Sequence, residues 1–192
     1  MERHFEQELE KLNRRILKMA GLVSAQVHDA MEALINCDTE LAAEVIEHDN
    51  QLDALDVKID KLCQRIFALQ QPVATDLRLI MAGLKINNDL ERMGDLAVSI
   101  AQKIDGLSGY QEIIGELRVD ELARNTERMV KDVVQLLNAR QTVLVADIFE
   151  ASAAIRNQIQ EINGGIIEKM MKKSDVVVVA TNLMIILTHM ER

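Results

Sequence analysis

Apolar side chains recur every three or four residues over most of this 192-residue sequence. This spacing follows the 3.6-residue turn of an α-helix, so each segment with it predicts a helix with one apolar stripe. Aromatic residues make up only 2% of the sequence and there is one proline. That composition favours helix formers over the aromatic and β-branched residues of strands. The sequence therefore predicts an all-α protein whose helices bury their stripes against one another.

The breaks in this pattern divide the sequence into helices. Asp38-Thr39 predicts a turn and an N-cap, because short oxygen-bearing side chains bond the free amides of a helix start. Pro72 ends the second helix and begins the third, since proline fits only the first turn. Residues 105–110, followed by Gly115, predict a linker. We expect six helices, at about residues 5–37, 39–69, 73–104, 116–137, 142–171 and 175–192.

The short connections imply antiparallel neighbours. We therefore expect two tandem three-helix bundles, residues 1–106 and 107–192. Three apolar stripes define the first bundle. They consist of Leu9, Leu12, Ile16, Met19, Val23, Val27, Ala30 and Leu34; of Leu52, Leu55, Ile59, Leu62, Ile66 and Leu69; and of Leu79, Gly83, Ile86, Leu90, Met93, Ala97, Ile100 and Ile104.

Charge and cysteine content limit the function classes. The net charge of −9 disfavours nucleic-acid binding, because phosphates would repel the protein. The longest apolar run, residues 176–187, is interrupted by Thr181 and Asn182, and we expect no membrane span. The charged first residues contain no signal-peptide core. Cys37 and Cys63 are too far apart for a CxxC site and are expected to be core residues of a cytoplasmic protein.

Two rows of acidic residues stand out against the apolar stripes. Asp49, Asp53, Asp56 and Asp60 lie at spacings of four, three and four, and Glu91 and Asp95 are four residues apart. Each row is about a third of a turn from its own apolar stripe. Antiparallel packing turns the rows either towards each other or away. Facing rows would bring four to six carboxylates together, a ligand set for hard cations such as Mg²⁺, Mn²⁺ or Fe³⁺. Spacing alone favours solvated faces.

Catalytic motifs have little support. A carboxylate-bridged di-iron enzyme requires Glu-x-x-His on two helices. The residues three positions before the four histidines are Met1, Ala25, Val45 and Ile186. A phosphate loop and a Ser-His-Asp set are also missing from the sequence. His28 is the one mid-helix candidate for phosphotransfer, and we expect it to pack or to face water. The sequence therefore predicts a protein that is not an enzyme.

Two sequence motifs form a long and specific pair. They are Gln70-Gln71-Pro72-Val73-Ala74-Thr75-Asp76-Leu77-Arg78 and Leu90-Glu91-Arg92-Met93-Gly94-Asp95. Together they resemble the PhoU family of bacterial phosphate-transport regulators. The resemblance implies two tandem three-helix bundles and multinuclear iron or zinc clusters. The implied ligands lie in Asp56-x-x-x-Asp60 and Glu91-x-x-x-Asp95, with Asp49 and Asp53 as further candidates. With the resemblance, metal binding becomes the preferred interpretation of the acidic rows, and a helical scaffold without metal remains the alternative.

The family's role implies partners for this protein. Members of the family bridge a sensor histidine kinase and a phosphate ABC transporter, which they contact through the transporter's ATPase. They keep the phosphate-starvation response off when phosphate is plentiful. The resemblance also favours a cytoplasmic homodimer that meets the membrane only through its partners.

The second half departs from the family pattern. Met190-Glu191-Arg192 echoes Leu90-Glu91-Arg92, but the sequence ends before a counterpart of Asp95. The helix with Glu161 reads Asn157-Gln158-Ile159-Gln160-Glu161, with an amide where a carboxylate is expected. We therefore expect an incomplete last helix, and a second metal site at Glu161 and Glu191 is the weakest of the predicted sites.

Overall fold

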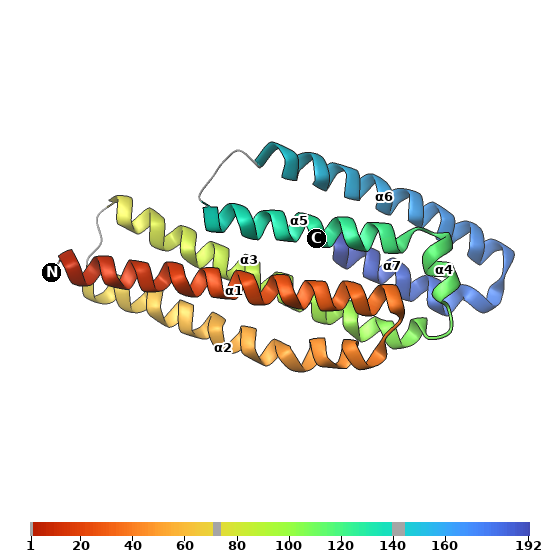
Figure 1. Cartoon of the computed structure of the whole chain (residues 1–192), viewed down its shortest axis with the longest axis horizontal. Helices are drawn as coiled ribbons and strands as arrows, with labels where there is room; N and C mark the ends of the chain where they lie inside the picture. The colour runs from red at the N-terminus through yellow and green to blue at the C-terminus, as the bar shows by residue number, and fades with distance from the viewer. Residues whose placement is uncertain (1, 71–73, 140–144) are drawn as a thin grey trace.

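The computed structural model describes residues 2–70, 74–139 and 145–192, all in helices and short connections (Figure 1). This confirms the all-α prediction. The long helices are α1 (Glu2–Asn36), α2 (Thr39–Gln70), α3 (Ala74–Ile104), α5 (Val119–Ala139), α6 (Val145–Lys172) and α7 (Val177–Glu191). Three short helices join them, namely η1 (Asp105–Leu107), α4 (Gln111–Glu116) and η2 (Ser174–Val176).

The helix boundaries agree with the predicted breaks to within three residues where the structure describes them. Pro72 and the predicted start of a helix at residue 142 lie outside the described residues. The linker prediction missed α4, a helix of only 6 residues that contains Gly115. Such a helix is too short to carry an apolar period. The turn before it uses Gly109, whose φ of 83° is the left-handed region that glycine adopts without strain.

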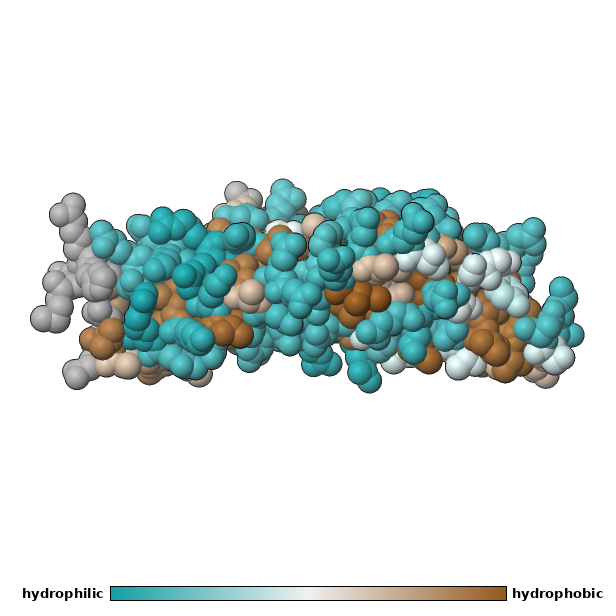
Figure 2. All heavy atoms as spheres, turned by 90° about the horizontal axis from the view of Figure 1, so that it is seen from below, coloured by the Kyte–Doolittle hydropathy of each residue, from teal (hydrophilic) through white to brown (hydrophobic). Residues whose placement is uncertain are grey.

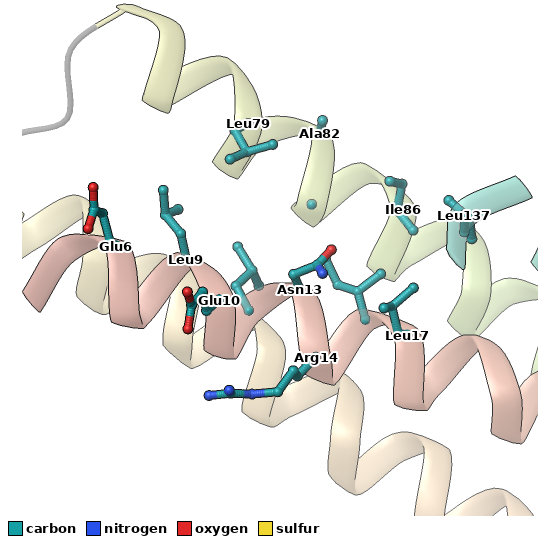
Figure 3. Close-up of a pocket in the computed structure, with 13 residues that line it drawn as sticks. Glu6, Leu9, Glu10, Asn13, Arg14, Leu17, Leu79, Ala82, Ile86 and Leu137 are labelled. Atoms are coloured by element: carbon teal, nitrogen blue, oxygen red, sulfur yellow. The ribbon is translucent and has the colours of Figure 1, made fainter. Parts of the chain in front are cut away.

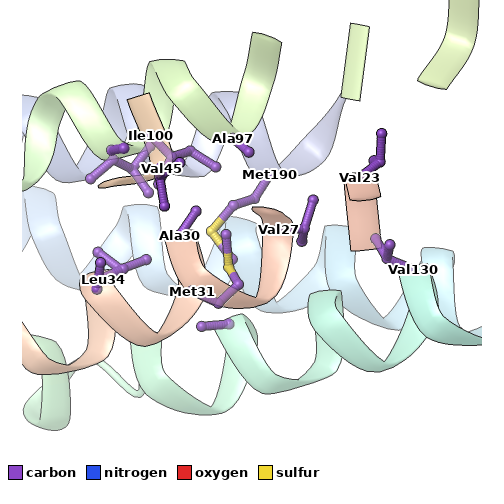
Figure 4. Packing of buried hydrophobic residues seen from close by; sticks show 14 of the residues in the cluster. Val23, Val27, Ala30, Met31, Leu34, Val45, Ala97, Ile100, Val130 and Met190 are labelled. Atoms are coloured by element: carbon purple, nitrogen blue, oxygen red, sulfur yellow. The ribbon is translucent and has the colours of Figure 1, made fainter. Parts of the chain in front are cut away.

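The long helices run side by side in an elongated molecule (Figure 1). Helices α1, α2 and α3 pack against one another, and α6 packs against both α5 and α7. The two groups also meet along their length, since α1 packs against α5 and α3 against α7. Figure 4 shows side chains from both groups in one core, including Met31 of α1, Val130 of α5 and Met190 of α7. The division at residue 106 stays a prediction, because the apolar core crosses it.

Most members of the predicted apolar stripes are buried, and the exposed ones lie at one end of the molecule. All members of the α1 stripe are buried except Leu9, which is partly buried. Leu69 and Leu79 are wrong as core residues, with 69% and 55% of their surface exposed. Leu69 lies in the last turn of α2. Near Leu79, α3 diverges from α1 (Figure 3), and Ile80 is buried in place of Leu79.

The last two helices form an apolar segment. Residues 174–191 are long and apolar enough to cross a membrane, with a mean hydropathy of 1.3, which corrects the expectation that no segment reaches this length. Leu183, Ile186 and Leu187 of this segment are buried in the core. A core helix of a bundle passes the same test of length and composition, and α7 occupies that position here.

The molecular surface seen in Figure 2 is mostly hydrophilic, with separate apolar patches.

Candidate functional site

The acidic rows of α2 and α3 face each other. Asn87 of α3 donates a hydrogen bond of 2.6 Å from Nδ2 to Asp56 Oδ1. Gly94 follows Asn87 by seven residues on α3, and its Cβ position lies beside Leu52 and Asp49 of α2. Asp49 in turn precedes Asp56 by seven residues. This antiparallel register sets Asp95 level with Asp49, and Glu91 level with Asp53. We call Asp49, Asp53, Asp56, Glu91 and Asp95 the acidic cluster.

Asp60 lies outside the acidic cluster. In the same register it is level with the α3 turn before Asn87, which carries no acid. Its Oδ2 accepts a hydrogen bond of 2.7 Å from Gln64 Nε2 on its own helix. The structure therefore brings Asp56, Glu91 and Asp95 of the predicted ligands together. It also places Asp49 and Asp53, which were predicted only as further candidates, opposite Asp95 and Glu91.

Mutual repulsion and partial burial affect the carboxyl groups of the cluster. Burial raises the pKa of Glu91, and the charges of Asp95, Asp56, Asp53 and Asp49 raise it further. Burial also raises the pKa of Asp95, with Asp49 and Asp53 adding to the effect. The pKa of Asp56 is raised by burial, while the hydrogen bond from Asn87 opposes the rise. A cation among these groups would offset the repulsion between them.

Two buried amides border the acidic cluster. Asn87 is fully buried and Gln26 of α1 is 5% exposed. Gln26 donates from Nε2 to Asp49 Oδ1 at 3.1 Å and to the Val45 carbonyl at 3.3 Å. The other amide atoms, Gln26 Oε1 and Asn87 Oδ1, are buried with no hydrogen-bond partner among the described residues. The cluster thus has oxygen donors only, which fits a hard cation. Gln26 was missed because it lies on a third helix, outside the two acidic rows.

The predicted second site has a different composition. Glu161 and Glu191 are both exposed. The groove near Glu161 contains an amide network in which Asn125 Nδ2 donates to Gln158 Oε1 at 3.0 Å, and Gln158 Nε2 to Glu121 Oε1 at 3.4 Å. These three polar groups bond to one another, so the described residues around Glu161 differ in composition from the acidic cluster. The second site at Glu161 and Glu191 stays a prediction.

Two further features were not predicted. His28, Glu32 and Glu127 have ligand atoms within 4.8 Å of one another, the only such set of three among the described residues. A groove of about 700 Å³ lies between α1 and α3 (Figure 3). The described residues of its lining are mainly apolar, with Arg14 as the one cation among them, beside Glu6 and Glu10. That charge balance gives no support to a phosphate site in this groove.

Comparison with known proteins identifies the family. The family profile described as the PhoU domain matches residues 16–104, which include both motifs of the resemblance. The phosphate-specific transport system accessory protein PhoU homolog of Aquifex aeolicus is 32% identical over 185 residues, covering 96% of this chain and 84% of that protein. The chain belongs to the PhoU family.

Other PhoU proteins support this assignment. The phosphate-specific transport system accessory protein PhoU of Serratia marcescens is 41% identical over 130 residues, or 68% of this chain. That alignment spans 54% of the Serratia protein, so the chain matches about half the length of this relative. The crystal structure of PhoU from Pseudomonas aeruginosa superposes with a TM-score of 0.89 at 30% identity, covering 97% of this chain and 90% of that one.

Membership confirms three predictions. The resemblance is a true family relationship, and the fold is PhoU-like. The PhoU family is a regulatory family without enzymatic activity, so the prediction that the protein is not an enzyme is also confirmed. The metal ligands and the partners are a separate matter.

Proposed function

We propose that this protein regulates phosphate uptake and phosphate-starvation signalling by bridging a phosphate ABC transporter and a sensor histidine kinase. Its PhoU relatives carry the name of phosphate-specific transport system accessory proteins, which supports this role. The protein would act in the cytoplasm as a homodimer of chains with two bundles each, residues 1–106 and 107–192. Contact with the membrane would come through the partners.

The acidic cluster carries the metal-binding part of the proposal. Glu91 and Asp95 on α3 face the acids of α2, and unpaired amide oxygens of Gln26 and Asn87 lie beside them. Iron or zinc would be held by Asp56, Glu91 and Asp95 together with Asp49 or Asp53, with Mg²⁺ or Mn²⁺ as alternatives. The cluster is open, because no three of its ligand atoms lie within 4.8 Å of one another in the described structure. Binding therefore requires the carboxylates to rotate inward.

A resident cation would supply charge neutralisation rather than catalysis. The repulsion that raises the pKa of Glu91 and Asp95 would then become attraction to the metal, and α2 and α3 would be held in their antiparallel register. Metal loading would thus stiffen the first bundle, the part of the chain in which both family motifs lie.

Elemental analysis of protein purified without chelator tests the metal site. We expect the metal content of Glu91→Gln/Asp95→Asn, which keeps the size of both side chains, to fall by at least one equivalent per chain below that of the wild type. Glu161→Gln/Glu191→Gln removes the same charge from exposed positions and should retain the metal. Equal metal content in all three proteins would refute the cluster as a site.

Partner binding is tested separately. The purified transporter ATPase and the cytoplasmic part of the kinase are each offered to the metal-loaded protein and to protein stripped with a chelator. Binding of both partners, weaker after stripping, supports the full proposal. Binding that is unchanged by stripping supports the alternative, a helical adaptor without metal. Binding to neither partner would refute the bridging role.

A further inference from the structure

A mixed histidine and carboxylate group joins the two halves of the molecule. His28 and Glu32 lie one turn apart on α1, and Glu127 lies on α5. His28 Nδ1 is 2.9 Å from Glu127 Oε1 although the residues are 99 positions apart. One ligand atom from each of the three side chains lies within 4.8 Å of the others. The three side chains thus converge from two helices on one point.

The group matches the ligand preferences of Zn²⁺ and not those of Mg²⁺ or Ca²⁺. Zn²⁺ accepts imidazole nitrogen with carboxylate oxygen, whereas the harder cations take oxygen almost alone. Ligand bonds of about 2.0–2.2 Å in a tetrahedral site place the ligand atoms roughly 3.3–3.6 Å apart. The three side chains are partly exposed, so a small rotation of each brings them from their present spacing to that one. Three protein ligands leave the fourth position to water.

The Glu127 side chain is a mostly buried carboxylate with two polar partners. Its side chain is 13% exposed, yet Lys131 Nζ and His28 both bond to it. Burial acts to raise the pKa of Glu127, but the contacts with Lys131 and His28 outweigh burial and lower it. The carboxylate is therefore ionised at neutral pH. Lys131 is 57% exposed and can swing into solvent, so it competes with a metal for Glu127 without blocking the site.

We propose that His28, Glu32 and Glu127 form a Zn²⁺ site that ties α1 to α5. This site is separate from the acidic cluster between α2 and α3 and does not rest on the proposed function. A metal bound here would link helices from the two halves of the chain, whereas one in the acidic cluster would link only α2 and α3.

Zinc titration of the chelator-stripped full chain tests the site. The measurements use Zn²⁺ alone and a competing dye, in a background of Glu91→Gln/Asp95→Asn so that the acidic cluster contributes no binding. We expect one zinc per chain in this background and no binding of Mg²⁺ at the same concentration. His28→Ala should weaken zinc binding by roughly tenfold or more.

Lys131 and His48 supply the controls. Lys131→Met removes the competing ammonium and should tighten zinc binding, an outcome that a purely structural role of Glu127 does not produce. His48 is exposed on α2 and lies outside the site, so His48→Ala should leave the affinity unchanged. Circular dichroism verifies that each variant is folded. Glu32→Gln, which changes a partly exposed side chain by one charge, replaces His28→Ala if the latter unfolds.

The outcomes are distinct. A zinc-dependent rise in melting temperature that is present in the background protein and lost in His28→Ala or Glu32→Gln supports the site. Equal zinc affinity in the background protein, His28→Ala and Glu32→Gln overturns it, as does weaker binding in Lys131→Met. Neither result alters the metal content attributed to the acidic cluster.

Discussion

At Gly94, α3 lies close to side chains of both α1 and α2. A Cβ atom there would lie 2.7 Å from Leu52 Cδ1 and 3.1 Å from Gln26 Oε1. Leu52 is buried in the core, where its neighbours restrict its movement. The missing side chain therefore lets the acids of α2 and α3 approach each other, and this is why a glycine is tolerated in the interior of α3.

We expect Gly94→Ala to destabilise the protein by up to about 2 kcal/mol. Overpacking costs about 1–3 kcal/mol, and the better helix propensity of alanine returns up to about 1 kcal/mol. Gly21→Ala is the matched control, because Gly21 lies within α1 with nothing near its Cβ position. That variant should be as stable as the wild type or more so. Urea denaturation measures both, and equal free energies of unfolding for the two variants would contradict the close approach at Gly94.

At the scale of helices, two residues make the turn from α1 to α2. Cys37 has a φ of 50°, in the left-handed region. The Asp38 amide donates to the Ala33 carbonyl at 2.9 Å, which closes the end of α1. Asp38 Oδ1 then accepts bonds of 3.0 Å from the amides of Glu40 and Leu41, which begins α2. The predicted N-cap is confirmed, and the same residue ends one helix and starts the next.

Asp38→Ala should lower the free energy of unfolding by about 1 kcal/mol, because the first amides of α2 lose their side-chain acceptor. Asp38→Asn keeps an acceptor oxygen at the same place and should lose little. Urea denaturation at neutral pH measures the difference. If the asparagine variant lost as much as the alanine variant, the charge of Asp38 rather than its capping bonds would account for the effect.

Over the whole molecule, one apolar core connects the two groups of three long helices. Met31 is 1% exposed and, with Val27 of the same helix, borders a cavity that Met129 and Val130 of α5 and Met190 of α7 also line. Figure 4 shows Met31, Val130 and Met190 in this part of the core. Contacts of this kind make the stability of one half depend on the other. A chain with two independent bundles would lack them.

We therefore expect a single cooperative unfolding transition. Helix content at 222 nm and the fluorescence of Tyr110, the single tyrosine, should change together with temperature. Met31→Ala should lower the free energy of unfolding by about 2–5 kcal/mol and shift both signals equally. Two separated transitions, with only one affected by Met31→Ala, would show that the bundles unfold independently.

The sequence alone determined the helical class, the breaks at Asp38 and near residue 105, and most of the residues that turn inward on the first three long helices. These follow from a period of 3.6 residues, which sets the direction of each side chain around its own helix axis. The period does not set how far one helix is shifted along its neighbour. That shift placed Asp49 and Asp53 opposite Asp95 and Glu91 and left Asp60 aside, and it exposed Leu79 where α3 diverges from α1.

Contacts between distant segments were decided only by the tertiary structure. Gln26 reaches Asp49, and His28 reaches Glu127 across 99 residues, yet neither pair has a spacing that a sequence period could reveal. The position of α5 against α1 depends on the summed packing of every apolar stripe in the core. The direction of a side chain is therefore a local property of its helix, whereas its partner across the core is a property of the whole fold.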